Sequence, residues 1–308
     1  MISIIICSRH TGISPSLKKN IEQTIGTEHE IITIDNSTNR YSIYSAYNEG
    51  VSLSRCPFLC FVHEDIKFHT TDWGIKLVAH LSDQKTGIIG VAGGKIMTKV
   101  PAQWSNCGRY INLIQYQHKT KISIKIKDPP SFSGVRHPAV LLDGVFLSSR
   151  RDVFNTIKFD ETFSGFHGYD YDICAQAINA GFENYVIYDI LLEHFSEGNM
   201  DERYYTNLIR IYKKWKNFLP VFSKDFAIHN QSELIEIDEK RMGRLFRRMS
   251  RRNFSSKEIV ETIKYFIDSF PPGEAKKKIR FLYLKIFFFR LFQSPKYIFK
   301  YNKSYSAC

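Results

Sequence analysis

LCFVHEDIKF, residues 59–68, joins a short apolar run to a histidine and two acids. The run Leu59–Val62 is typical of a buried strand, and the apolar pattern resumes directly after the polar residues. Polar side chains at the end of a buried strand are unfavourable unless they bind something. His63-Glu64-Asp65 is therefore a candidate site for a metal ion, a proton or water.

Short apolar runs alternate with helical patterns through the first hundred residues. The helical patterns are Ser14–Ile25, which begins with a Ser-Pro cap, and Ser42–Leu53. This alternation with short connections predicts an α/β fold, in which a mostly parallel, Rossmann-like sheet carries helices on both faces. The predicted strands are Ile2–Cys7, Glu30–Asp35, Phe58–Val62 and Ile88–Ala92.

Polar clusters follow three of these strands. They are Ser8-Arg9-His10, Asp35-Asn36-Ser37 and His63-Glu64-Asp65. Ligands of such sheets bind at the carboxyl ends of the strands, so we expect the three clusters to meet in one site.

The pattern changes beyond residue 95. Residues 95–138 are irregular and include an exposed alternating segment, KTKISIKIKDPP (119–130). A buried strand at 140–148 is interrupted by Asp143-Gly144, and the next helix ends before Gly181. From residue 201 the sequence is helical. We therefore expect one domain at 1–220, divided near residue 95, and a helical region at 221–308.

The composition is that of a folded protein with a basic end. Residues 1–200 carry 19 Lys and Arg against 20 Asp and Glu, whereas residues 201–308 carry 24 against 11. No uninterrupted apolar stretch reaches the ~20 residues that span a bilayer. Met1–Ile6 lacks the basic start of a secretory signal, so we interpret it as a strand. Six scattered cysteines indicate reduced thiols in a cytoplasmic protein.

Several short motifs occur in a recognisable order along the chain. They are IDNS (34–37), AYNEG (46–50), FVHEDI (61–66), LLDGVFLSSRRDVF (141–154), FHGYDYDIC (166–174) and EHFSEG (193–198). In this order they resemble glycosyltransferase family 2 and its relatives with the GT-A fold, over about residues 1–200. The resemblance implies an inverting hexosyltransferase, with a nucleotide-sugar half at 1–95 and an acceptor half at 96–220.

The resemblance also implies roles for the residues at the strand ends. Asp65 would hold a divalent metal, Mn²⁺ or Mg²⁺, which neutralises the departing diphosphate, and Glu64 would contact the nucleotide-sugar beside it. Asp35 would bind the base, and its carboxylate favours a UDP-type donor, although guanine also presents donors. Ser8 and Arg9 would lie beside it, with Arg9 able to reach a phosphate. His63 stands where the family has an acid, and its role is open.

Asp170 and Asp172 lie two residues apart at a helix start, so they cannot share a face and need different roles. By resemblance Asp170 is the general base that activates the acceptor hydroxyl. Asp172 is interpreted as structural, capping the helix or holding a basic side chain. The alternative is that both acids only stabilise a positive helix terminus.

The segment His194-Phe195-Ser196-Glu197-Gly198 matches a loop of the family whose histidine approaches the metal or the diphosphate. His194 is therefore a second candidate metal ligand, and the alternative is a half-buried histidine without a ligand. The resemblance places four residues at the acceptor side of the site: Trp104, Asp143, Gly144 and His167.

Two basic segments mix cations with large apolar residues, at 241–252 and 276–292. Basic amphipathic helices bind anionic membrane surfaces, which suits a glycan or lipid-linked acceptor and a peripheral position at the inner face of the cell membrane. The alternative is packing on the catalytic domain or on a partner subunit in an oligomer. Nucleic-acid binding is the weaker third option, because the aromatic residues cluster with aliphatic ones.

Two other functions compete with this interpretation. A sugar nucleotidyltransferase would need a glycine-rich, basic loop after the first strand, and CSRHTGISPS (7–16) has little glycine. A non-catalytic membrane- or polyanion-binding protein on a degenerate GT-A fold remains open.

Overall fold

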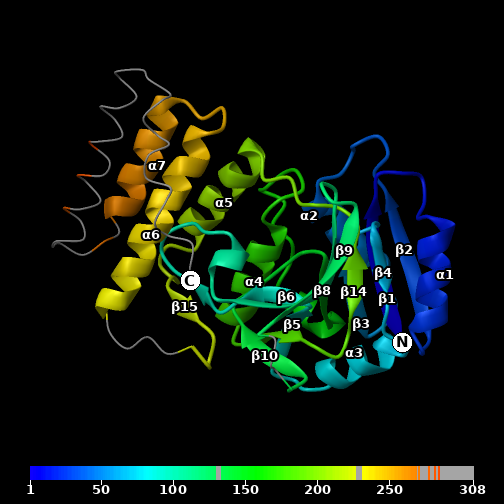
Figure 1. The fold of residues 1–308 in the computed structure, drawn as a ribbon. Helices are drawn as coiled ribbons and strands as arrows, with labels where there is room; N and C mark the ends of the chain where they lie inside the picture. The colour runs from blue at the N-terminus through cyan, green and yellow to red at the C-terminus, as the bar shows by residue number, and fades with distance from the viewer. Residues whose placement is uncertain are drawn as a thin grey trace. The chain divides into compact units, whose positions relative to one another are not determined.

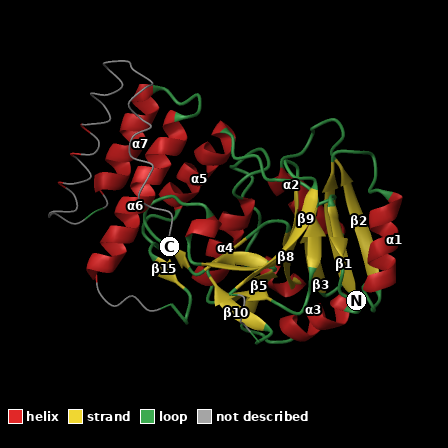
Figure 2. Cartoon of the chain, in the orientation of Figure 1, coloured by secondary structure: helices red, strands yellow, loops and turns green. Residues whose placement is uncertain are grey.

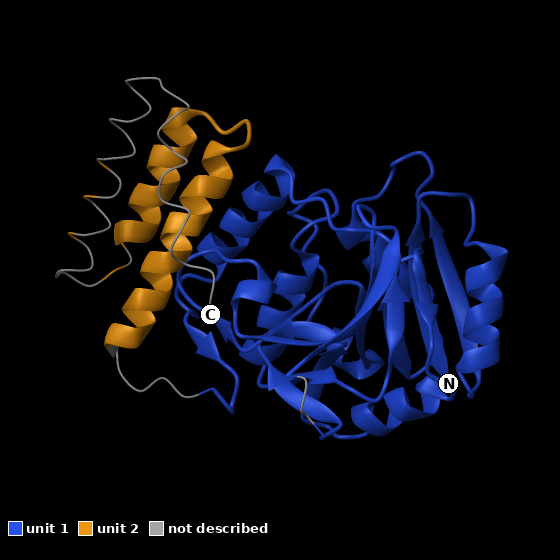
Figure 3. Cartoon of the chain, in the orientation of Figure 1, with its two compact units in different colours: residues 1–229 blue, residues 230–308 orange. Residues whose placement is uncertain are grey.

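A computed structural model of the chain describes residues 1–129, 133–226, 231–268 and 270, with 277, 281 and 284. The chain divides into two compact units, Met1–His229 and Asn230–Cys308, which Figure 3 distinguishes by colour. Among the described residues, strands occur only in the first unit, and the second is helical (Figure 2). The first unit extends beyond the boundary expected at residue 220, because β15 (Val221–Phe222) pairs with β7 (Ile96–Met97).

A seven-stranded mixed sheet forms the centre of the first unit, in the order β10-β13-β5-β12-β3-β1-β2. Figure 1 labels β1, β2, β3, β5 and β10 of this sheet. β1 pairs in parallel with β2 and with β3, as the strand–helix alternation predicts. β12 instead runs antiparallel between β3 and β5, because no crossover helix precedes it. The strands are β1 (Ile2–Ser8), β2 (His29–Asp35), β3 (Phe58–Val62), β5 (Thr86–Gly90), β10 (Arg136–Ala139), β12 (Phe146–Arg150) and β13 (Glu183–Ile187).

Helices cover both faces of this sheet. Successive side chains of a strand point to opposite faces, and in β1 the residues Ile2, Ile4 and Ile6 join a core that includes side chains of α1 and α3. Ile5 points the other way, where a Cβ on Gly50 of α2 would lie 2.2 Å from Ile5 Cγ2. The predicted fold class is therefore confirmed. The helices are α1 (Pro15–Thr24), α2 (Ile43–Leu53), α3 (Trp73–Leu81) and α4 (Tyr169–Asn179).

A second sheet has the strand order β11-β6-β8-β14-β4, and β9 pairs with β8. It shows that residues 95–138 are more regular than expected, since β8 and β9 form a long antiparallel hairpin. The exposed alternating segment is β9, which is solvent-facing over most of its length. The strands are β4 (Ile66–Phe68), β6 (Ala92–Gly94), β8 (Arg109–Gln117), β9 (Ile122–Asp128), β11 (Leu141–Leu142) and β14 (Leu192–His194).

Turns and short elements link the two sheets. The segment predicted as one strand at 140–148 forms two, β11 and β12, which belong to different sheets on either side of Asp143-Gly144. The remaining short elements are the 3₁₀ helices η1 (Trp104–Asn106) and η2 (Arg151–Asn155).

The chain continues in helices, as predicted from residue 201. They are α5 (Glu202–Lys214) in the first unit, and α6 (Gln231–Ser250) and α7 (Ser256–Asp268) in the second. α7 begins with a capping box, in which the N–H of Ser255 donates to the Glu258 carboxylate and the N–H of Glu258 donates to the Ser255 hydroxyl. The basic segment 276–292 lies outside the described residues apart from three positions. No helix among the described residues is long and apolar enough to cross a bilayer.

Candidate active site

The polar clusters at the ends of β1, β2 and β3 meet at one edge of the sheet. Ser8 is in register with Asp35 on β2, and its hydroxyl donates to Glu64 Oε2 at 2.6 Å. Arg9 binds Glu64 twice, through its backbone N–H at 3.1 Å and its Nε at 2.7 Å. Burial alone would raise the pKa of Glu64, but the hydrogen bonds from Ser8 and Arg9 lower it below its ordinary value. Glu64 is therefore a carboxylate that orders the β1 end.

Asp35 lies at the exposed rim of this edge. One of its oxygens accepts the backbone N–H of Ser37 at 2.9 Å, and this contact with Ser37 lowers the pKa of the carboxyl. The side chain is solvent-exposed. The contact forms an Asx-type turn, which holds an ionised acceptor where the nucleotide base would be expected.

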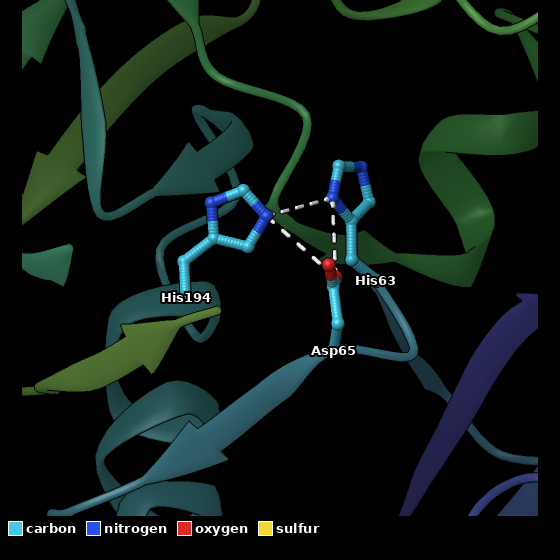
Figure 4. A group of neighbouring side chains, drawn as sticks. All are labelled: His63, Asp65 and His194. Atoms are coloured by element: carbon cyan, nitrogen blue, oxygen red, sulfur yellow. Dashed lines mark hydrogen bonds and ion pairs between the residues drawn. The ribbon is translucent and has the colours of Figure 1, made fainter. Parts of the chain in front are cut away.

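Three ligand atoms converge where β3 passes into β4. His63 Nδ1 lies 3.4 Å from His194 Nε2 and 4.0 Å from Asp65 Oδ1, and His194 Nε2 lies 3.6 Å from the same Asp65 oxygen. Figure 4 shows the two rings and the carboxylate directed at one point. Atoms at these separations can all lie about 2.1 Å from a single ion, the usual metal–nitrogen distance. The three residues therefore fit a divalent metal.

The segment before β4 that carries His63 and Asp65 is held beside the end of β14, which carries His194. β14 pairs with β4, so that His194 is opposite Ile66, and the N–H of Phe195 donates to the carbonyl of Asp65 at 3.0 Å. Burial and the neighbouring His194 lower the pKa of His63, which favours the neutral imidazole that binds metals. His63 had no role assigned from the sequence. Its spacing of two from Asp65 is the signal that could have assigned one, because side chains two residues apart in an extended chain point the same way.

Asp170 lies at the first turn of α4 and is held by backbone donors. The N–H of Gly144 donates to its Oδ2 at 3.2 Å, and the N–H of Tyr171 to its Oδ1 at 3.0 Å. Burial and the nearby charge of Asp143 raise the pKa of Asp170 to about 7. A carboxyl with this pKa can accept a proton near neutral pH, as a general base must.

Asp143 and Gly144 form the turn that meets α4. Asp143 Oδ1 accepts the N–H of Val145 at 2.9 Å, which closes the turn. A Cβ on Gly144 would lie 2.0 Å from the Tyr169 hydroxyl oxygen, so the close approach requires glycine. Both residues, predicted on the acceptor side, are therefore direct neighbours of Asp170.

Asp172 has a different environment, as its spacing from Asp170 requires. It is almost fully buried and binds Lys214 Nζ at 2.7 Å. It also accepts from Trp215 Nε1 at 2.8 Å and from Gln176 Nε2 at 2.7 Å. The residue therefore holds a basic side chain and ties α4 to the end of α5.

Trp104 and His167 both lie near the start of α4. The N–H of Trp104 donates to the hydroxyl of Tyr171, and its side chain is half-buried. The carbonyl of His167 accepts from Tyr44 and Asn207, and its ring packs edge-on against that of Tyr204. Burial lowers the pKa of His167. Both predicted acceptor-side residues are therefore adjacent to the segment that carries Asp170.

Together, the mixed sheet and the site at its strand ends define a protein of the GT-A fold. The sequence model described as "Glycosyltransferase like family" matches residues 3–217. The chain belongs to this glycosyltransferase family. The family match also favours a glycosyltransferase over the nucleotidyltransferase that competed with it.

Solved structures resemble the chain at low sequence identity. "Crystal structure of GalNAc-T7 with UDP, GalNAc and Mn2+" is 15% identical with a TM-score of 0.48, covering 88% of this chain and 58% of that one. "Crystal structure of S. aureus TarS 1-349 in complex with UDP-GlcNAc" is 13% identical with a TM-score of 0.52, covering 88% and 81%. The chain thus spans less than two thirds of the first. No curated protein matches the sequence.

Proposed function

We propose that this protein is a metal-assisted, inverting glycosyltransferase that moves a sugar from a UDP-type nucleotide-sugar to a hydroxyl of a glycan or lipid-linked saccharide. The observation that carries the proposal is the pairing of two features at one sheet edge. One is the three-residue metal centre, and the other is Asp170, whose pKa of about 7 suits a base.

The donor side of the proposed reaction uses the β1, β2 and β3 ends. Asp35 offers an exposed carboxylate to a base N–H, and the Arg9 guanidinium, whose side chain is 71% exposed, is free to meet a phosphate as well as Glu64. His63, Asp65 and His194 would hold Mn²⁺ or Mg²⁺. When bound, such an ion neutralises the charge that develops on the departing diphosphate.

The acceptor side is centred on Asp170. The backbone N–H groups of Gly144 and Tyr171 hold its carboxylate, so that it can take the proton of the attacking hydroxyl without moving. A base on the side opposite the leaving group produces inversion in one step. Two exposed phenylalanines offer aromatic faces to a sugar. Phe166 directly precedes His167 in the chain, and Phe195 directly follows His194.

A panel of nucleotide-sugars tests this function on the full chain. We would measure nucleotide release with saccharide acceptors in the presence of Mn²⁺, beginning with UDP-GlcNAc, and determine the anomeric configuration of the product by NMR. We expect metal-dependent release and an inverted product. No turnover together with no nucleotide-induced thermal shift would instead favour a non-catalytic binding protein on this fold.

The basic part of α6 supports membrane-surface binding as a second property. Burial and the charges of Arg244, Arg251 and Arg248 lower the pKa of Arg247, which shows like charges gathered at one helix end. Such a cluster attracts anionic lipid headgroups. Substituting Arg247, Arg248 and Arg251 with Glu should abolish sedimentation with phosphatidylserine vesicles, and unchanged sedimentation would refute this proposal. Packing on a partner subunit would instead appear as a change of oligomeric state.

A further inference from the structure

The histidines of the metal centre each use their outer ring nitrogen in a hydrogen bond. His63 Nε2 lies 2.9 Å from the hydroxyl of Tyr169, and His194 Nδ1 lies 3.3 Å from Gln115 Oε1. In Figure 4 these two nitrogens point away from the Asp65 carboxylate. The partners of Tyr169 and Gln115 decide which ring nitrogens carry protons.

Tyr169 can satisfy its contacts in only one way. Its hydroxyl lies 2.9 Å from the carbonyl oxygen of Gly144, which can only accept. The single hydroxyl proton therefore goes to Gly144, and the hydroxyl oxygen accepts from His63. This assigns the proton of neutral His63 to Nε2 and leaves a lone pair on Nδ1, inside the metal centre.

Gln115 gives the same result for His194 by an independent route. Its Nε2 group donates to the carbonyl of Ser196 at 2.8 Å, and also to those of Tyr116 and His194. These carbonyls fix the orientation of the amide, so Oε1 is the atom that faces His194 Nδ1. An amide oxygen only accepts. The proton of His194 is therefore on Nδ1, and Nε2 carries a lone pair.

Two lone pairs and one carboxylate oxygen thus face one another across the centre. His63 Nδ1 and His194 Nε2 cannot hydrogen-bond at their 3.4 Å separation when neither carries a proton. Ser196 Oγ lies 3.2 Å from His194 Nε2 and has one proton to offer, whereas a cation between the three atoms would satisfy all of them at once.

We propose that Tyr169 and Gln115 are positioning residues that preset the two histidines in their metal-binding tautomers. The inference rests on the metal centre of the proposed function and deepens it. Tyr169 has a second effect through Gly144, whose carbonyl it binds and whose N–H binds Asp170. One hydroxyl therefore orients a metal ligand and supports the turn that holds the base.

Binding of Mn²⁺ to the full chain, without turnover, tests the proposal. We expect Tyr169→Phe and Gln115→Leu each to raise the Mn²⁺ dissociation constant, measured by EPR of the free ion, by about 10-fold to 100-fold. The matched control for Tyr169 is Tyr110→Phe, which removes a buried hydroxyl bound to Asp225. The matched control for Gln115 is Asn112→Leu on the same strand, β8, which removes an amide bound to the carbonyls of Tyr188 and Ile190. Both controls should bind Mn²⁺ like the parent.

Histidine tautomers provide a readout that a purely structural role would not change. In long-range ¹H–¹⁵N NMR spectra of the metal-free chain, we expect His63 to be protonated at Nε2 and His194 at Nδ1. In Tyr169→Phe we expect the proton of His63 to be no longer confined to Nε2. His63 protonated at Nδ1 in the parent, or equal Mn²⁺ affinity in all four variants, would overturn the inference. Failure of the parent itself to bind Mn²⁺ would refute the metal centre of the proposed function instead.

Discussion

The backbone N–H of Gly144 donates to Asp170 Oδ2 at 3.2 Å, across a separation of 26 residues in the chain. This contact attaches Asp170, the proposed base, to the turn between β11 and β12. The carbonyl of the same glycine accepts the hydroxyl of Tyr169, which in turn contacts His63. A single residue, Gly144, therefore connects the proposed base with the proposed metal centre through its N–H and its carbonyl, and changes to it should affect both.

Substitution of Gly144 by Ala should damage the site. The new Cβ would lie 2.0 Å from the Tyr169 hydroxyl oxygen and 2.4 Å from Cζ, so Tyr169 must move. We expect a loss of about 1–3 kcal/mol in the free energy of unfolding, measured by urea denaturation, with a lower kcat. Gly243→Ala in α6, where a Cβ meets nothing within 4 Å, is the control and should be neutral or stabilising. Equal effects of the two variants would contradict the expectation.

Asp170→Asn should abolish transfer and leave donor binding intact. The amide cannot take the proton of the acceptor hydroxyl, so we expect kcat to fall by about 10² to 10⁴, with an unchanged dissociation constant for UDP-GlcNAc measured by calorimetry. Normal turnover in this variant would rule out Asp170 as the base.

The transfer rate should depend on pH through Asp170. Its pKa is raised to about 7, and the base works only when it is deprotonated. We therefore expect kcat to rise with pH through about 7, where it is half-maximal, and to level off above that pH, as measured with Mn²⁺ held saturating at each pH. A profile already flat from pH 5 would mean that Asp170 is ionised throughout that range.

Loss of His63 should weaken metal binding as much as loss of His194, since each supplies one of the three converging atoms. We expect either histidine→Gln variant to raise the Mn²⁺ dissociation constant and to need more Mn²⁺ for activity after EDTA treatment. The control is His80→Gln, which removes a buried histidine bound to Asp189. If His63→Gln behaves like this control, His63 is not a ligand.

Asp172→Ala should lower the free energy of unfolding. The carboxylate is 1% exposed and accepts from Trp215 Nε1 and Gln176 Nε2, so its removal takes an acceptor from both, while Lys214 keeps its ion pair with Asp160. We expect a loss of about 1–3 kcal/mol in the free energy of unfolding. Asp152→Ala removes a carboxylate that is 59% exposed beside Arg150 and should cost about 1 kcal/mol or less. Comparable losses in the two variants would contradict a structural role for Asp172.

Local sequence patterns determined the first half of the fold. Alternating strands and helices predicted β1, β2, β3, α1 and α2 to within a few residues, because each is specified by its own periodicity and caps. The same patterns predicted that Ser8, Asp35 and Glu64 would meet, since the carboxyl ends of neighbouring parallel strands lie at one edge. The order of the motifs predicted the glycosyltransferase family, which the family match confirms.

The tertiary structure decided what depends on pairing between distant segments. Neither the antiparallel insertion of β12 nor the second sheet follows from local periodicity, because strand partners are chosen by packing over the whole chain. His63 and His194 are 131 residues apart, and their approach requires β14 to pair with β4. The sequence by itself supplied the chemical groups of the site, and only the folded chain brought His194 to His63 and Asp65 and held Gly144 against Asp170.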